Sequence, residues 1–309
     1  MNKLLTTALL FASCAMAQQE PQFTQFWNAL PYFNPATGAR EYDHEAYANI
    51  RDQWTNVYGN PSTQLLSYST KLNGIHSSVG GSYMHENIGF STFHKVKATY
   101  AYQFRLGRRT FLTCGLAAGV QYMKNSGVFV TGPGIDPILD SFMVPSTRFT
   151  ADFGLAFRWR KLDLGLSATQ IPQRKYANGY RDALHLFGFV GYDISLGSIS
   201  NYKPGFVLRP QVFLKTDLNF YTVDYNVLLK YNNTFYLGLT FRSTDSYSLM
   251  AGWDVQVKKV KFRVSYAYDM WFSKLNNGVV GGTHEIGLGF LFKKIEKKSS
   301  PYIKATDSF

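Results

Sequence analysis

The feature that most constrains this chain is an alternation of apolar and polar side chains every two residues, which dominates from about Ala46 onward. The stretches 149–159, 246–257 and 260–270 show it most clearly. Successive side chains of a β-strand point to opposite faces, so each stretch predicts a strand with one apolar and one polar face. No comparable stretch at helical spacing interrupts the series. The sequence therefore predicts an all-β fold.

The alternating segments number about fourteen, and many of them are long. They lie near 46–54, 62–70, 74–85, 91–105, 110–124, 147–160, 162–170, 183–195, 205–217, 219–230, 233–242, 246–257, 260–270 and 283–292. Several reach ten residues or more, whereas the usual strand has about 5–6. A tilted strand of about 9–11 residues is long enough to cross a membrane.

The connections between these segments alternate in length. Those after the second, fourth, sixth, tenth and twelfth segments are tight, whereas 125–146, 171–182 and 271–282 are long. Short turns at one end and long loops at the other are typical of outer-membrane barrels. An even number of strands also returns the C-terminus to the side of the N-terminus, which we expect to be the periplasm.

A sandwich of two sheets would alternate in the same way, with its apolar faces turned inward. Three features favour a transmembrane antiparallel β-barrel over that alternative. The strands are long, and aromatic residues cluster toward strand ends, as at Tyr266, Tyr268 and Trp271-Phe272, as interfacial girdles require. The polar faces carry ions in mid-strand, as a polar lumen allows: Asp152, Asp193, Arg209, Lys215, Asp224, Asp254 and Arg263. In lipid such a sheet must close on itself, and we expect it in the cell outer membrane.

The two ends of the chain predict three further segments. Residues 1–17 have the pattern of a signal peptide that ends in Ala15-Met16-Ala17, although a lipidated Cys14 is an alternative. Residues 18–45 form an aromatic lead whose prolines oppose both helix and central strand. We expect this lead to pack against or inside a barrel of residues 46–292, like a plug. Residues 293–309 form a C-terminal tail, which we expect in the periplasm.

Catalytic and ligand-binding motifs are missing from the sequence. The six histidines lack metal-ligand spacing, and no Gly-x-Ser-x-Gly elbow occurs. We therefore predict no catalytic, cofactor or metal site and no enzymatic activity. The formal net charge of +12 comes with no RNA-binding motif, so nucleic acid is not an expected partner. Lysines and arginines near barrel rims are expected to bind anionic lipid head groups of the outer membrane.

Motifs at both ends of the chain resemble one known family. They are Gln22-Phe23-Thr24-Gln25-Phe26, Asn34-Pro35-Ala36, Arg51-Asp52-Gln53-Trp54, Pro61-Ser62-Thr63-Gln64, Gly238-Leu239-Thr240-Phe241-Arg242, Tyr266-Ala267-Tyr268-Asp269 and Gly282-Thr283-His284-Glu285-Ile286. Their order and content resemble the PorP/SprF proteins of Bacteroidetes. The resemblance gives a structural or assembly role to these signature residues: Arg51, Asp52, Gln53, Trp54, Pro61, Gly238, Arg242, Tyr268, Asp269, His284 and Glu285.

The resemblance implies a function in protein secretion. Members of that family are outer-membrane barrels of the type IX secretion system, which exports or anchors proteins carrying a C-terminal signal domain and in some species supports gliding motility. Implied partners are a PorE-like peptidoglycan-binding protein, the PorK/PorN ring and the secreted cargo. No cofactor is implied. The sequence leaves open a diffusion porin or solute transporter, and a barrel enzyme acting on lipid or peptide.

Overall fold

The computed structural model describes residues 20–40, 42–72, 74–125, 145–172, 183–196, 205–272 and 281–293. Most of them lie in strands: β1 His44–Asp52, β2 Ser62–Leu72, β3 Ser77–Ile88, β4 Ser91–Gly107, β5 Thr110–Asn125, β6 Ser146–Trp159, β7 Leu162–Ile171, β8 His185–Tyr192, β9 Ile194–Leu196, β10 Phe206–Thr216, β11 Tyr221–Tyr231, β12 Phe235–Arg242, β13 Ser246–Val257, β14 Val260–Trp271 and β15 Thr283–Phe292. The predicted signal peptide with Cys14, and tail residues 294–309, lie outside the described residues.

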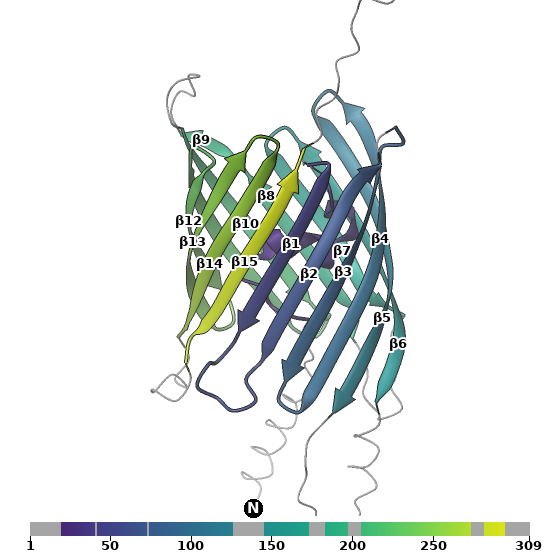
Figure 1. Cartoon of the computed structure of the whole chain (residues 1–309), viewed down its shortest axis with the longest axis vertical. Helices are drawn as coiled ribbons and strands as arrows, with labels where there is room; N and C mark the ends of the chain where they lie inside the picture. Colours follow the sequence, from purple (N-terminus) through teal and green to yellow (C-terminus); the bar gives the residue numbers. More distant parts are fainter. Residues whose placement is uncertain are drawn as a thin grey trace, which may run out of the picture.

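The strands close into one antiparallel barrel (Figure 1). Each strand pairs with its neighbours in chain order, and β15 returns to β1, with Ile286 opposite Ile50. Both β8 and β9 pair with β10, and the register of that pairing continues unchanged across Asp193. They are therefore two parts of one barrel strand, interrupted at Asp193. The barrel has fourteen strands, which confirms the predicted fold class.

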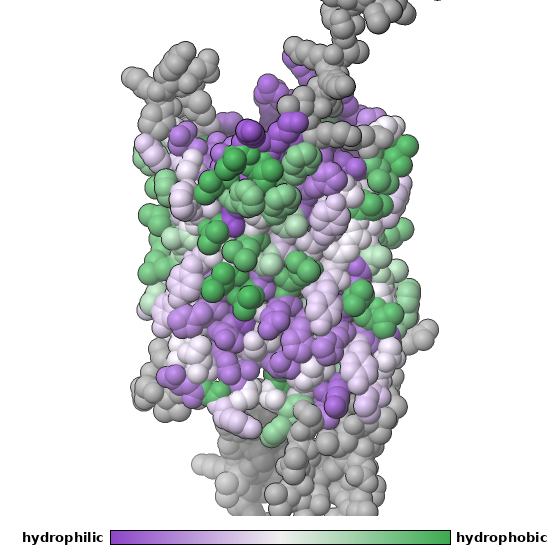
Figure 2. Space-filling model, viewed as in Figure 1, coloured by the Kyte–Doolittle hydropathy of each residue, from purple (hydrophilic) through white to green (hydrophobic). Residues whose placement is uncertain are grey.

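The alternation of the sequence separates an apolar outer wall from a polar lumen. In β12 the pattern is strict from Phe235 to Arg242, with every second side chain buried. Leu237 on the outer face is 65% exposed, whereas Arg242 on the inner face is fully buried. Figure 2 shows hydrophobic residues gathered over the strands and hydrophilic residues toward the rims. A sandwich would bury its apolar faces, so the outward apolar wall identifies an outer-membrane type of barrel.

The two ends of the barrel differ in their connections. At one end β4 turns into β5 through Arg108-Arg109, and β13 turns into β14 through Lys258-Lys259. We call this the short-turn end. The last residues of β1, β5, β7 and β14 lie at the other end, where four connections of 9 to 20 residues leave the wall. We call it the long-connection end; residues 126–144, 173–182 and 273–280 of these connections lie outside the described residues. The short-turn end has one connection of comparable length, the nine residues 197–205 between β9 and β10.

The lead lies inside the barrel, where it forms α2 (Phe26–Phe33) and the short 3-10 helix η2 (Pro35–Thr37) (Figure 1). The expectation that its prolines oppose a helix is wrong for α2, which contains Pro31. Pro31 removes one hydrogen-bond donor late in an eight-residue helix, and the amide of Asn34 still donates to the carbonyl of Leu30 at 2.8 Å. Packing against the wall stabilises such a short helix more than its own backbone bonds do.

The lead crosses the lumen along its length. Its first described residue, Glu20, bonds to Gln170 near the end of β7, toward the long-connection end. Its last part meets the short-turn end, where the amide of Asp43 donates to the carbonyl of Phe292 at 2.9 Å. β1 begins at His44, two residues before the predicted start of the barrel. Within the described residues, no helix has the length and apolar character needed to cross a membrane.

Candidate functional site

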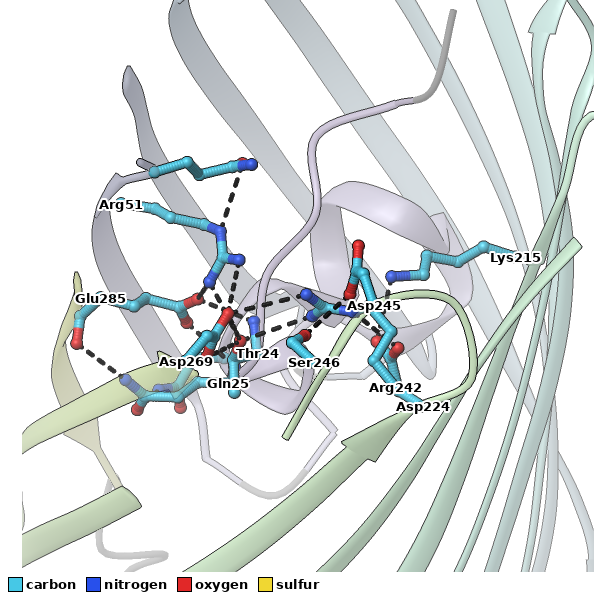
Figure 3. A network of polar contacts seen from close by, with 12 residues as sticks. Thr24, Gln25, Arg51, Lys215, Asp224, Arg242, Asp245, Ser246, Asp269 and Glu285 are labelled. Atoms are coloured by element: carbon cyan, nitrogen blue, oxygen red, sulfur yellow. Dashed lines mark hydrogen bonds and ion pairs between the residues drawn. The ribbon is translucent and has the colours of Figure 1, made fainter. Parts of the chain in front are cut away.

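The lead is held by a buried network of ion pairs in the lumen, near the long-connection end (Figure 3). Arg51, at the end of β1, forms its centre. One guanidinium nitrogen of Arg51 donates to Glu285 at 2.9 Å and to the hydroxyl of Thr24 at 3.0 Å, and the other donates to Asp269 at 2.6 Å. Arg51 and Glu285 face each other across paired strands β1 and β15. The strand register alone therefore places this pair together on the inner wall.

Arg242 extends the network to the neighbouring strands. Its Nε donates to Asp224 at 2.9 Å, and Lys215 binds the same carboxylate at 3.0 Å. A second nitrogen of Arg242 lies 3.6 Å from Asp269. Asp269 thus joins two clusters of ions, so the network runs along the inner wall from β10 to β1.

Thr24 of the lead lies where these ions meet. Its hydroxyl donates to Asp269 at 2.8 Å and accepts from Arg51, with Arg242 at 3.4 Å. The carboxylate of Glu285 accepts the backbone amides of Thr24 at 2.7 Å and Gln25 at 2.9 Å. These amides precede the first turn of α2, where a negative charge is favourable. The wall therefore places an anion beside the start of the lead helix.

The cations of this network are surrounded by carboxylates. Three cations, Arg51, Arg242 and Lys215, pair with Asp224, Asp269 and Glu285, and a fourth carboxylate, Asp245, lies beside Arg242 (Figure 3). The six paired side chains are at most 9% exposed. Removing a charge from water is costly unless it is paired and hydrogen-bonded. Because these paired ions are buried and bind Thr24 and Gln25, they hold the start of the lead in one position.

A second buried cluster holds the lead at Glu20. Glu20 accepts from Lys95 at 2.9 Å, from Tyr32 at 3.0 Å and from Gln170. Burial raises the pKa of Glu20, but the charges of Lys95 and Lys97 outweigh burial and hold this pKa well below its usual range. Glu20 is therefore ionised in the folded barrel at neutral pH.

Apolar contacts fill the space between these clusters. Phe26 stacks on Phe213 with ring centroids 4.7 Å apart, and Phe33 lies 4.9 Å from Phe187. On the neighbouring strands β6 and β7 the side-chain amide of Asn34 donates to the carbonyls of Leu155 and Leu166, both at 3.0 Å. The lead thus contacts strands all around the barrel, and its aromatic side chains Phe23, Phe26, Tyr32 and Phe33 are buried.

Two glycines of the wall lie directly against η2 and the residue before it. A Cβ atom added at Gly115 would clash with the backbone of Pro35 and Ala36. A Cβ atom added at Gly154 would clash with the side chain of Asn34. These inward positions of β5 and β6 leave room for the lead only because they have no side chain.

A cavity of about 340 Å³ remains in the lumen toward the short-turn end. Trp27, Leu30 and Pro31 of α2 line one side, and Asn233 lies at the turn after β11. Ten of its 21 lining residues are charged: Arg40, Glu45, Arg158, Asp163, Asp193, Arg209, Lys230, Asp254, Lys261 and Arg263. Here Asp163 binds Arg40 at 2.7 Å, with Arg158 and Arg209 each 3.6 Å away. We call this space the vestibule.

The signature residues separate into four groups. The buried network brings together Arg51, Arg242, Asp269 and Glu285. Asp52 ends β1, and the connection after it holds Gln53, Trp54 and Pro61, where the amide of Gln53 donates to the carbonyl of Pro61 at 2.9 Å. Tyr268 and His284 lie on the outer wall with ring centroids 5.1 Å apart. Gly238 faces the lumen from β12, where a Cβ atom would clash with Leu228 and Met250.

Three members of the network are not among the signature residues. Thr24 lies within the family motif of residues 22–26, and the sequence predicts Asp224 and Lys215 only as inward ions of two strands. Their pairing depends on barrel closure and on where the lead lies, neither of which a spacing in the sequence reveals. Among the described residues, no group of three or more His, Cys, Asp or Glu side chains is arranged to hold a metal ion.

Comparison with solved structures places the fold among outer-membrane channels. The CymD monoaromatic hydrocarbon channel has a TM-score of 0.53 at 11% identity, covering 92% of this chain and 97% of the channel. The Ralstonia pickettii toluene transporter TbuX has a TM-score of 0.51 at 9% identity, covering 87% and 94%. At such low identities the likeness concerns the fold alone.

Sequence comparison identifies the family. No curated protein matches this chain in sequence. The family model for the type IX secretion system membrane protein PorP/SprF matches residues 15–290, which include the lead and nearly all of the barrel. The chain therefore belongs to the PorP/SprF family of type IX secretion system membrane proteins.

Proposed function

We propose that this protein is a plugged barrel of the type IX secretion system that supports export or surface anchoring of cargo with a C-terminal signal domain through contacts with periplasmic partners. The observation that carries the proposal is the family match over residues 15–290, which includes the lead that fills the lumen. The signature residues Arg51, Arg242, Asp269 and Glu285 then have an assembly role, because they fix the lead in the lumen.

The closed lumen supports a role through contacts. A diffusion channel needs a continuous aqueous path, and here the lead contacts the wall on all sides. Lys215 of the network lines a pocket of only about 20 Å³, which is too small for a substrate, and we propose no enzymatic activity. The vestibule and the basic short turns offer charged surfaces at the end that we assign to the periplasm. Charged rims of this kind govern encounter and register with a partner more than affinity.

A diffusion porin or solute transporter remains the second candidate. It is favoured by the shared fold with CymD and TbuX, which are named for the small molecules that they carry. The two candidates differ in their partners, since a porin needs no periplasmic machine.

Native purification separates these candidates. The tagged protein is extracted from its own membrane in mild detergent, and the proteins that accompany it are identified. We expect a PorE-like peptidoglycan-binding protein and components of the PorK/PorN ring. An unrelated outer-membrane barrel with the same tag is the control, and a variant lacking residues 293–309 tests whether the tail holds these partners. Recovery of the same few proteins with both barrels would contradict the proposal.

A further inference from the structure

An open hollow of about 730 Å³ lies on the outside of the barrel at the short-turn end. Its lining comes from two short turns and the strand ends below them: Arg108, Arg109, Thr110, Trp159, Arg160, Lys161 and Tyr192. The turns after β4 and β6 are tied together, because the amide of Arg160 donates to the carbonyl of Arg109 at 2.9 Å. The lining cations therefore belong to one connected rim.

The charge of this hollow is entirely positive. Arg108, Arg109, Arg160 and Lys161 line it, and no carboxylate of the described residues does. The hydrogen bond from Lys161 to the hydroxyl of Ser195, at 2.8 Å, is to a neutral group and leaves the charge uncompensated. The vestibule inside the lumen differs, because four carboxylates face its cations.

Below the cations the wall is apolar and faces outward. Trp159 is 50% exposed and Tyr192 is 46% exposed, and the guanidinium of Arg160 lies 5.7 Å from the ring of Trp159. Trp159 pairs with Thr110 and Leu162, and Leu162 pairs with Tyr192, so these side chains form one row across the strands. The next outward row contains only apolar side chains: Leu112, Phe157, Leu164 and Val190.

We propose that this hollow binds an anionic phospholipid, with its phosphate between the four cations and its acyl chains along the two rows below. Arginine and lysine bind phosphate oxygens by charge-assisted hydrogen bonds. Tryptophan and tyrosine lie at the level of lipid head groups in membrane barrels. An acidic surface of a protein partner would match the cations but not the membrane-facing rows, so the lipid fits both halves of the site.

Quenching of Trp159 by brominated lipid tests the proposal. The protein is reconstituted in phosphatidylcholine vesicles with rising fractions of brominated phosphatidylglycerol or brominated phosphatidylcholine, and Trp159→Phe provides the background of the other tryptophans. We expect that the fraction of brominated phosphatidylglycerol that quenches half of the Trp159 fluorescence is roughly tenfold lower than that of brominated phosphatidylcholine. Equal quenching by the two lipids would overturn the proposal.

Substitution of the cations locates the site. The variant R108A/R109A/R160A/K161A should be quenched equally by brominated phosphatidylglycerol and brominated phosphatidylcholine. If this fourfold variant folds poorly, Arg160→Ala alone is tested and should show a weaker preference for the anionic lipid. The matched control K258A/K259A removes two cations from another turn of the same rim and should keep the preference. An unchanged preference in the fourfold variant, with loss of periplasmic partners, would make this rim a protein-docking surface. A change of Trp159 fluorescence on addition of inorganic phosphate, with equal quenching by the two lipids, would make the hollow a site for free phosphate. Either of these two results contradicts the proposal.

Discussion

At the scale of single residues, Arg51 is the side chain on which the buried network depends most. It is the one residue that binds Asp269, Glu285 and Thr24 at once. Its removal leaves two carboxylates buried without their main partner. Breaking a buried ion pair by removing one partner typically costs about 3–5 kcal/mol.

We therefore predict that Arg51→Ala lowers the free energy of unfolding by about 3–5 kcal/mol, measured by urea unfolding in lipid vesicles. Arg108→Ala, on an exposed turn, is the control and should change stability by less than about 0.5 kcal/mol. An Arg51→Ala protein as stable as the wild type would show that the network does not hold the barrel and its lead together.

Glu20 predicts a pH dependence of stability. Its pKa is held below the usual value of 4.5 in the folded protein by Lys95 and Lys97, with His185 adding to their effect, against the contribution of burial. The folded state therefore binds a proton less readily than the unfolded chain does. This contribution to stability is fully present above the unfolded pKa and is lost as pH falls through the range toward the folded pKa.

Comparison with Glu20→Gln isolates this contribution. The difference in unfolding free energy between the wild type and Glu20→Gln should be constant from about pH 7 to pH 5 and smaller at about pH 3. A difference that stays constant down to pH 3, or grows as pH falls, would mean that Glu20 is not stabilised in its charged form.

At the scale of elements, the lead is the segment that decides what the lumen can do. Phe26 and Phe33 pack on β8 and β10, and the amides of Thr24 and Gln25 donate to Glu285 of β15. We predict that the wild type conducts little current in planar lipid bilayers and that deletion of residues 20–40 raises its conductance severalfold.

Gly154→Val displaces the lead without shortening the chain, because the valine side chain would occupy the place of Asn34. This variant should also conduct more than the wild type does. A variant lacking residues 294–309 is the control and should conduct as the wild type does. Equal conductance of the wild type and the lead deletion would show that the lead does not close the lumen, and the porin alternative would then be favoured.

The elements also show how far the sequence determines the fold. Strands of strict alternation, such as Phe235–Arg242, were predictable because each side chain must face either lipid or lumen. The break at Asp193 could not be predicted from the sequence. The residues on both sides of it pair with β10 in the same register, so the break leaves the strand pattern unchanged. The helix α2 was missed because Pro31 argues against a helix locally, whereas packing inside the barrel stabilises it. The inward ions were predictable, but their partners depend on closure and on the lead.

At the scale of the whole molecule, the alternation of connection lengths predicts orientation. The short-turn end, where β1 begins and β15 ends, is assigned to the periplasm, and the long-connection end to the cell exterior. An epitope inserted near Gly134, between β5 and β6, should therefore bind antibody on intact cells. An epitope replacing Lys258-Lys259 is the control and should bind only after permeabilisation. The reverse pattern of antibody binding would show that the short-turn end faces the cell exterior, which contradicts this orientation.

The central claim is that this barrel serves secretion by contacts and not as an open pore. The most direct test is deletion of the gene, followed by measurement of cargo with a C-terminal signal domain on the cell surface and in the medium. We predict that this cargo is lost from both, that unrelated outer-membrane barrels stay at normal levels, and that the wild-type gene restores export. Cargo at normal levels on the surface of the deletion strain would contradict the account.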